Sequence, residues 1–386
     1  MIEPKLRFKA DDGSQFPDWE EKTIDEVAEC LDNKRVPVNS EERKKRVGII
    51  PYYGAGGIQG YIDDYLFDEE LVLLLEDGDA FDDFQTKSIA QYITGKSWVN
   101  NHAHVLRANG NSYFLFASLE HKDIRRWTQL AGASRKKLLK DSMLKITVNI
   151  PSLPEQQKIA DFLSTIDTVI EKQKETASAW EERKKGVMQK LFSQKVRFKA
   201  DDGDQFPEWE EKKLGEVFEF YNGKAHENVI SENGKYVVVN SKFISTDGTV
   251  RKYTNEMIFP LIKKDIVMVM SDVPNGKAIS KCFLINENNK YTLNQRICCL
   301  RTKENAVFYI NQISRNKYFL KFDDGVKQTN LRKNDILQCP LLCPCLAEQQ
   351  KIADCLSSLD EVIKKQKATL AVWEELKKGL LQQMFV

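Results

Sequence analysis

The chain has 386 residues and a formal net charge of +1, from 58 Lys and Arg against 57 Asp and Glu. This length allows two or three domains, and the balanced charge excludes a globally basic protein, so any nucleic-acid signal must be local. Eight cysteines without paired CxxC spacing indicate free thiols; a zinc site at Cys339, Cys343 and Cys345 is the weaker alternative because no histidine lies nearby. The N-terminal residues are polar and no apolar run reaches ~18 residues, so we expect a cytoplasmic protein with no membrane partner.

The chain opens with a short motif that occurs again in its second half. Residues 7–29 match residues 197–219 at 17 of 23 positions, with an offset of 190. Each copy is followed by a variable block, over residues 24–150 and 214–343. Short apolar runs such as ELVLLLE (70–76) and KDIVMVM (264–270) indicate buried strands, and each block also holds a probable helix, around 112–130 and 305–319. The blocks are therefore expected to be mixed, strand-rich domains.

Each variable block is followed by a long helical segment, and these two segments are also copies of each other. Residues 155–192 and 348–385 agree at 24 of 38 positions, contain no proline, and place apolar residues three and four apart. At about 1.5 Å per residue each helix would be roughly 57 Å long. An ordinary bundle core is one explanation of the apolar stripe. A coiled-coil seam explains the heptad spacing better, and Gln173 and Gln366 would fix its register. The expected seam residues are Ile159, Ile166, Gln173, Trp180, Val187, Ile352, Leu359, Gln366, Trp373 and Leu380.

These repeats define the expected architecture as an α+β protein built by pseudo-twofold tandem duplication. Two strand-rich domains, residues 1–153 and 197–346, alternate with two long helices, residues 154–196 and 347–386. The first helix begins where the first domain ends and finishes where the second domain begins. If the second helix packs on the first, the two must be antiparallel and must separate the domains.

The candidate functional residues are polar and basic side chains in turns and at strand ends. Residues 121–145 hold eight Lys or Arg against two Asp, whereas residues 61–85 hold ten Asp or Glu and no cation. Basic clusters beside Asn, Gln, Ser and Tyr suit phosphate contacts and base-edge readout, although a solvated basic face is the simpler alternative. The expected DNA-facing residues are Tyr52, Tyr53, Lys96, Ser97, Asn100, Asn101, His102, Arg135, Lys136, Lys137, Asn240, Ser241, Lys242, Ser271, Asn275, Lys277, Asn294, Gln295, Arg296, Lys327, Gln328, Asn330 and Arg332.

Other motifs argue against a catalytic centre in the chain. GAGGIQG (54–60) lacks the Lys-Ser/Thr of a phosphate loop, so a tight turn is the better interpretation. His102 and His104 alternate on a probable strand, but no carboxylate or cysteine spacing completes a metal site. We therefore expect no catalytic residue, no metal and no cofactor in this chain.

The repeated motifs resemble the DNA-specificity subunit of type I restriction–modification enzymes over essentially the whole length. The resemblance rests on the openings that carry Trp19 and Trp209, on IPSLPEQQKIADFL (150–163) and on PCLAEQQKIADCL (344–356). It implies two target-recognition domains that each read one half of a split site on double-stranded DNA, with the helices as a spacer. It further implies two modification subunits that use S-adenosylmethionine, and restriction subunits that use ATP and magnesium. A non-catalytic coiled-coil scaffold that binds two different proteins is the alternative.

Overall fold

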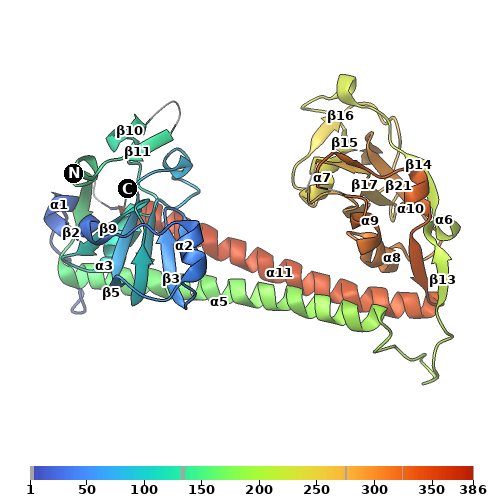
Figure 1. Cartoon of the computed structure of the whole chain (residues 1–386), viewed down its shortest axis with the longest axis horizontal. Coiled ribbons are helices and arrows are strands. Elements are labelled where there is room, and N and C mark those ends of the chain that lie inside the picture. Colours follow the sequence, from blue (N-terminus) through green and yellow to red (C-terminus); the bar gives the residue numbers. More distant parts are fainter. Residues whose placement is uncertain (1–3, 132–134, 274–275, 324, 386) are drawn as a thin grey trace. The chain divides into compact units, whose positions relative to one another are not determined.

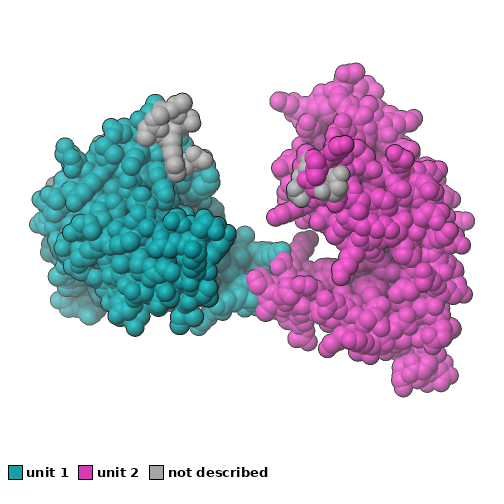
Figure 2. All heavy atoms as spheres, in the orientation of Figure 1, with its two compact units in different colours: residues 1–176, 366–386 teal, residues 177–365 magenta. Residues whose placement is uncertain are grey.

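The computed structural model describes residues 4–131, 135–273, 276–323 and 325–385. Two compact units divide the chain: unit 1 comprises residues 1–176 and 366–386, and unit 2 comprises residues 177–365 (Figure 2). Each unit holds one strand-rich domain and part of both long helices, α5 (Leu153–Phe192) and α11 (Leu346–Phe385), which Figure 1 labels. The expected mixture of helix and strand is confirmed, and so is the tandem duplication.

The domain of unit 1 is built on two four-stranded sheets. The first has the order β2-β9-β6-β7 and is antiparallel throughout; the second has the order β4-β3-β8-β5, with β3 and β8 parallel. Two further pairs, β1 with β12 and β10 with β11, are antiparallel. The strands are β1 (Glu20–Thr23), β2 (Ala28–Cys30), β3 (Ile50–Gly54), β4 (Gly57–Ile62), β5 (Phe67–Asp68), β6 (Leu71–Leu75), β7 (Ala90–Ile93), β8 (Lys96–Val99), β9 (Ala103–Ala108), β10 (Thr128–Ala131), β11 (Arg135–Leu138) and β12 (Thr147–Ile150). The short helices are α1 (Ile24–Val27), α2 (Ser40–Lys45), α3 (Ser112–Leu119) and α4 (Lys140–Met143).

The domain of unit 2 repeats this topology with different side chains. One sheet has the order β14-β21-β17-β19, and a three-stranded sheet has the order β16-β15-β20, with β15 and β20 parallel. Two short pairs, β13 with β23 and β18 with β22, complete it. The strands are β13 (Glu210–Lys213), β14 (Glu219–Asn222), β15 (Tyr236–Val239), β16 (Lys252–Thr254), β17 (Ile266–Val269), β18 (Ser271–Asp272), β19 (Cys282–Leu284), β20 (Tyr291–Leu293), β21 (Ile297–Arg301), β22 (Thr329–Asn330) and β23 (Pro340–Cys343). The helices are α6 (Leu214–Val217), α7 (Ser241–Ser245), α8 (Ala306–Ile313), α9 (Lys317–Leu320) and α10 (Lys333–Leu337).

Each domain has a central strand that is buried on both faces. In β6, Val72 and Leu74 belong to the core beneath α3, whereas Leu71 and Leu73 belong to a core on the opposite face. Successive strand residues point to opposite faces, so burial on both sides requires an unbroken apolar run. The runs at 70–76 and 264–270 therefore predicted their strands correctly.

The expected helices of the variable blocks are shorter than the sequence indicated. In unit 1, α3 ends at Leu119, and the chain continues through a 3-10 turn (Arg125–Trp127) into β10. In unit 2, the segment is divided into α8 and α9, because Ser314 leaves the helix in an extended conformation. Among the described residues, no helix is both long enough and apolar enough to cross a membrane.

The EQQK motif at the start of each long helix is a buried anchor. In unit 1, Glu155 is fully buried and accepts hydrogen bonds from Arg7 Nη2 at 2.8 Å and Trp19 Nε1 at 3.2 Å. In unit 2, Glu348 accepts the same bonds from Arg197 at 2.8 Å and Trp209 at 2.9 Å. The motif thus ties each helix start to the short N-terminal segment of its own repeat, which explains why both are duplicated together.

The parts of α5 and α11 within each unit pack antiparallel. In unit 1, Gln173 Nε2 donates to Gln366 Oε1 at 2.6 Å, and Lys377 pairs with Asp167 at 2.8 Å. In unit 2, Lys184 pairs with Asp360 at 2.6 Å, which is the same contact displaced by 193 residues. The two glutamines expected to fix the register therefore meet in the structure.

The apolar seam residues differ in how deeply they are buried. Ile159, Ile166 and Ile352 are buried. Val187, Leu359, Trp373 and Leu380 are partly buried against the cores of their units. Trp180 is half-buried with Arg183 over its ring at 5.1 Å, and no apolar core of the described residues includes it. The expectation that both tryptophans lie in the seam therefore rests mainly on Trp373.

The last turns of α11 complete the core of unit 1. Met384 is fully buried, and the Phe385 ring lies 6.2 Å from Trp19 and 5.5 Å from Phe114. The Leu6 amide donates to the Gln383 carbonyl at 3.1 Å. In unit 2, the equivalent hydrogen bond runs from the Val196 amide to the Lys190 carbonyl, between positions only six residues apart. Unit 1 is therefore discontinuous in sequence, whereas unit 2 is one continuous stretch.

Candidate nucleic-acid interface

A polar turn follows the parallel strand pair at the same place in each domain. In unit 1, the Asn100 amide donates to the Tyr53 carbonyl at 3.0 Å, just beyond β8. In unit 2, the Asn294 amide donates to the Val239 carbonyl at 3.1 Å, just beyond β20. Because the paired strands are parallel, their carboxyl ends meet at one edge, and a rigid frame presents the turn there. A cavity opens beside each turn.

The cavity of unit 1, called here the first cleft, has a volume of about 420 Å³. Gln59 is held in it because Asn100 Nδ2 donates to Gln59 Oε1 at 3.3 Å and because Gly54 leaves room for the amide. A Cβ on Gly54 would lie only 2.1 Å from Gln59 Nε2. Arg43 lies over the Tyr52 ring at 4.6 Å, and no ion pair of Arg43 occurs among the described residues. The lining residues are Pro37, Val38, Asn39, Arg43, Tyr52, Gln59, Asn100, Asn101 and His102.

The cavity of unit 2, the second cleft, has a volume of about 320 Å³. Arg296 is exposed and has a φ of 65°, in the left-handed region that non-glycine residues rarely adopt. Its side chain makes no hydrogen bond or ion pair within the described part of the chain. Asn294 Oδ1 is buried and is likewise without a partner there. The lining residues are Glu227, Asn240, Ser241, Lys242, Asn294, Gln295 and Arg296.

The clefts bring together part of the set expected to face DNA. Asn100, Asn101 and His102 line the first cleft. The second cleft contains a larger group from the expected set, namely Asn240, Ser241, Lys242, Asn294, Gln295 and Arg296. Arg43 and Gln59 were missed. For Arg43, the one available signal was Asn39, which caps the short basic helix α2. Gln59 lies in the glycine-rich segment for which the sequence predicts a tight turn.

Besides Asn100, which is 4% exposed but lies in the turn at the first cleft, three of the expected DNA-facing residues are buried within strands, and their assignment is wrong. Tyr52 is 1% exposed, and its hydroxyl donates to the Val38 carbonyl at 3.2 Å. Ser97 is fully buried within β8, and Ser271 is 8% exposed and accepts a hydrogen bond from Gln328 at 2.6 Å. Each lies within a strand rather than in a turn, so its side chain points into the domain.

The remaining expected residues lie away from the clefts. Lys136 forms an ion pair with Asp82, and Lys137 forms one with Glu76 at 3.0 Å, so neither ammonium group is free to contact a phosphate. Lys96 lies over the Tyr65 ring at 4.6 Å. A separate exposed group beside β18 and β22 comprises Lys277, Lys327, Gln328, Asn330 and Arg332. Asn275 and the Arg135 side chain lie outside the described residues.

A buried charge network surrounds His104 in unit 1, and the acidic run contributes Glu76 to it. His104 is 1% exposed; its Nδ1 lies 2.6 Å from Asp32 Oδ2, and its Nε2 lies 2.9 Å from the Leu138 carbonyl. Arg35 bridges Asp32 at 3.2 Å and Glu76 at 2.6 Å. Burial raises the pKa of the Asp32 carboxyl, but the hydrogen bonds from His104 and the Val105 amide, together with the nearby Arg35, lower this pKa below its ordinary value. Within the described ranges, no cluster of His, Cys, Asp and Glu could hold a metal ion.

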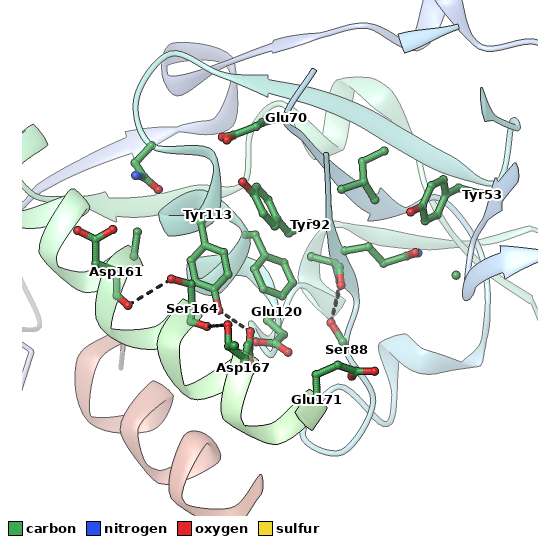
Figure 3. A pocket seen from close by; sticks show the side chains of 18 of the residues that line it. Tyr53, Glu70, Ser88, Tyr92, Tyr113, Glu120, Asp161, Ser164, Asp167 and Glu171 are labelled. Atoms are coloured by element: carbon green, nitrogen blue, oxygen red, sulfur yellow. Dashed lines mark hydrogen bonds between the residues drawn. The ribbon is translucent and has the colours of Figure 1, made fainter. Parts of the chain in front are cut away.

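Another cavity, of about 910 Å³ in unit 1, is unsuited to phosphate. Figure 3 shows its floor, where Tyr113 donates to Asp167 on α5. Lys377 neutralises part of this floor through Glu120 at 2.9 Å and Asp167 at 2.8 Å. Further carboxylates line the cavity at Glu70, Asp161 and Glu171, and its lining contains no Lys or Arg among the residues that the structure describes. Its negative charge would repel a DNA backbone, whereas the two clefts carry cations, Arg43, Lys242 and Arg296, that form no ion pair within the described ranges.

Comparison with known proteins identifies the class to which this fold and these paired clefts belong. The family model of the type I restriction modification DNA specificity domain matches the chain twice, over residues 17–177 and 207–372. The chain belongs to this family and is a DNA-specificity subunit. The resemblance seen in the repeated motifs is thereby confirmed, and the scaffold alternative is not favoured.

Individual relatives agree with this assignment. A putative type I restriction enzyme specificity subunit of Haemophilus influenzae is 40% identical over 157 residues, which are 40% of this chain and only 38% of that protein. The MjaVIII specificity subunit of Methanocaldococcus jannaschii is 25% identical over 413 residues, covering 97% of this chain and 94% of the relative. The crystal structure of a type I restriction-modification S subunit from M. genitalium shares the fold, with a TM-score of 0.64 and 16% identity over 100% of this chain and 99% of that one.

Proposed function

We propose that each domain of this specificity subunit reads one half of a bipartite site on double-stranded DNA. The helices α5 and α11 would set the gap between the half-sites and would dock two modification subunits. Restriction subunits would join the same complex. The chain itself would be non-catalytic, with S-adenosylmethionine, ATP and magnesium used by the partner subunits.

The observation that carries this proposal is the pair of clefts. The frame is the same in both domains, since a parallel strand pair ends in an asparagine whose amide bonds the neighbouring strand. The side chains around that frame differ: Arg43, Gln59 and Asn101 in unit 1, against Lys242, Gln295 and Arg296 in unit 2. One frame with two sets of hydrogen-bonding groups is what two different half-sites require.

The long helices support the spacer role through their length and their contacts. Each is a continuous helix of 40 residues, about 60 Å at 1.5 Å per residue. One DNA turn spans ~34–36 Å, so this length suits half-sites separated by one to two turns. Paired glutamines and repeated ion pairs fix the helical register, which a spacer of defined length needs.

Methylome sequencing tests the proposal directly. Cells with the chain should show a bipartite methyladenine motif that is missing from cells without it. Exchanging residues 214–343 for the equivalent block of a relative should change one half-site and leave the other half-site and the gap intact. A swap that altered both half-sites, or that prevented assembly with the modification subunits, would contradict independent reading by the two domains.

A further inference from the structure

The turn Asn294–Arg296 of unit 2 is held by three backbone hydrogen bonds to three different segments. The Asn294 amide donates to the Val239 carbonyl at 3.1 Å, and the Gln295 amide donates to the Lys224 carbonyl at 2.9 Å. The Arg296 carbonyl accepts from the Met270 amide at 2.9 Å. The turn also presses against Gly223, where an added Cβ would lie 1.9 Å from the Asn294 carbonyl oxygen. Its backbone is therefore fixed before any ligand arrives.

Within the described part of the chain, Asn294 Oδ1 and the Arg296 guanidinium have no partner, whereas the Gln295 side-chain amide donates to a carboxylate oxygen of Glu227. Arg296 keeps a φ of 65° although a glycine would adopt it without strain. The guanidinium is exposed beside the second cleft, with no partner among the described residues. Buried polar atoms normally have partners, yet Asn294 Oδ1 has none there. Strained backbone and unsatisfied polar groups concentrate at binding sites because the surrounding fold maintains them for a ligand.

The equivalent position of unit 1 offers amides in place of a cation. The turn there is Asn100–His102, and Asn100 Oδ1 accepts from the His102 amide at 2.8 Å. Gln59 Oε1 has a second lone pair free beyond its 3.3 Å bond to Asn100. The exposed Asn101 side chain makes no hydrogen bond within the described part of the chain. The two domains thus present different chemistry from one structural position.

We propose that each cleft is the base-reading element of its domain, with Arg296 of the unit 2 turn recognising a guanine and Gln59, on β4 beside the unit 1 turn, recognising an adenine. The proposal rests on the proposed function, since it assumes that the clefts face DNA. A guanidinium pairs bidentately with O6 and N7 of guanine, and a glutamine amide pairs with N6 and N7 of adenine. Lys242, on α7 at the rim of the second cleft, contacts a phosphate and does not read sequence.

The test uses the complex of the full chain with its modification subunits and a DNA library with both half-sites randomised. The variants are Arg296→Gln and Arg296→Gly; the second favours the left-handed turn and so protects against a folding defect. Both should weaken binding to the wild-type site roughly 5- to 150-fold, the equivalent of ~1–3 kcal/mol. Both should make one guanine of one half-site degenerate and leave the other half-site and the gap unchanged.

Two matched variants complete the design. Gln59→Ala should make one adenine of the other half-site degenerate, and Lys242→Gln should weaken binding to all sequences and lower the salt slope by about one. A uniform loss in the Arg296 variants, with an unchanged motif, would show a phosphate contact and overturn the inference. If the wild-type complex selected no bipartite sequence at all, the proposed function itself would fail, which is a distinguishable result.

Discussion

Replacing Arg7 with Ala should destabilise unit 1 more than the replacement of any exposed charged side chain in that unit would. Glu155 is fully buried and accepts hydrogen bonds from Arg7 Nε at 3.1 Å and Nη2 at 2.8 Å; in the variant, Trp19 at 3.2 Å would be its one remaining side-chain donor among the described residues. Removing one partner of a buried pair typically costs ~3–5 kcal/mol because the other charge stays buried. For a unit of about 200 residues, each kcal/mol lowers the melting temperature by ~2–4 °C, so we expect a fall of roughly 6–20 °C.

Differential scanning calorimetry measures this effect, because the two units need not unfold in one transition. Lys158→Ala is the matched control: it breaks an ion pair with Asp11, whose side chain is 95% exposed, and should cost at most ~1 kcal/mol. Arg197→Ala should act on unit 2 in the same way. The reasoning would be refuted if Arg7→Ala lowered the melting temperature no more than Lys158→Ala does.

Three further outcomes follow from features of the helices and of the charge network. Inserting four residues after Lys174 and four after Lys367 adds ~6 Å to each helix, so the gap in the methylated motif should grow by one or two base pairs; a changed half-site with an unchanged gap would contradict the spacer role. Trp373→Ala should lower the melting temperature of unit 1 by several degrees because Trp373 packs on its core, whereas Trp180→Ala should have a smaller effect because Trp180 does not. The pKa values of Asp32 and Glu76 are lowered in the folded state, so their contribution to stability is complete above their ordinary pKa near 4 and is lost as pH falls through the folded values. As pH falls, the free energy of unfolding should therefore decrease less steeply in the Asp32→Asn variant than in the wild-type protein. An identical pH dependence of the two proteins would show that the network does not stabilise unit 1.

The elements that could be predicted from the sequence are those specified by local pattern. An unbroken apolar run predicts a strand that is buried on both faces, and β6 is one. The three-and-four spacing predicts both long helices, whose observed starts at Leu153 and Leu346 are one residue from the expected positions.

The failures come from contacts between distant residues and from one local irregularity. Glu155 and its partner Arg7 are 148 residues apart, so nothing in EQQKIA shows that the motif is an anchor. Arg43 reaches the first cleft from a helix that precedes the strand pair. A bulge between Tyr52 and Tyr53 breaks the alternation of β3, so the sequence could not show which tyrosine points inward.

The discontinuity of unit 1 has a consequence for the order in which the chain folds. Residues 177–365 contain all of unit 2, so its core can close as soon as they have left the ribosome. Unit 1 begins first but is completed only by Leu381, Met384 and Phe385, which fill its core just over 200 residues after α5 leaves that unit. Closing so long a loop has an entropic cost that grows only slowly with length, yet the delay leaves an apolar surface of unit 1 uncovered until those residues are made. Unit 2 can therefore complete its fold before unit 1, whose core depends on residues that are made after all of unit 2.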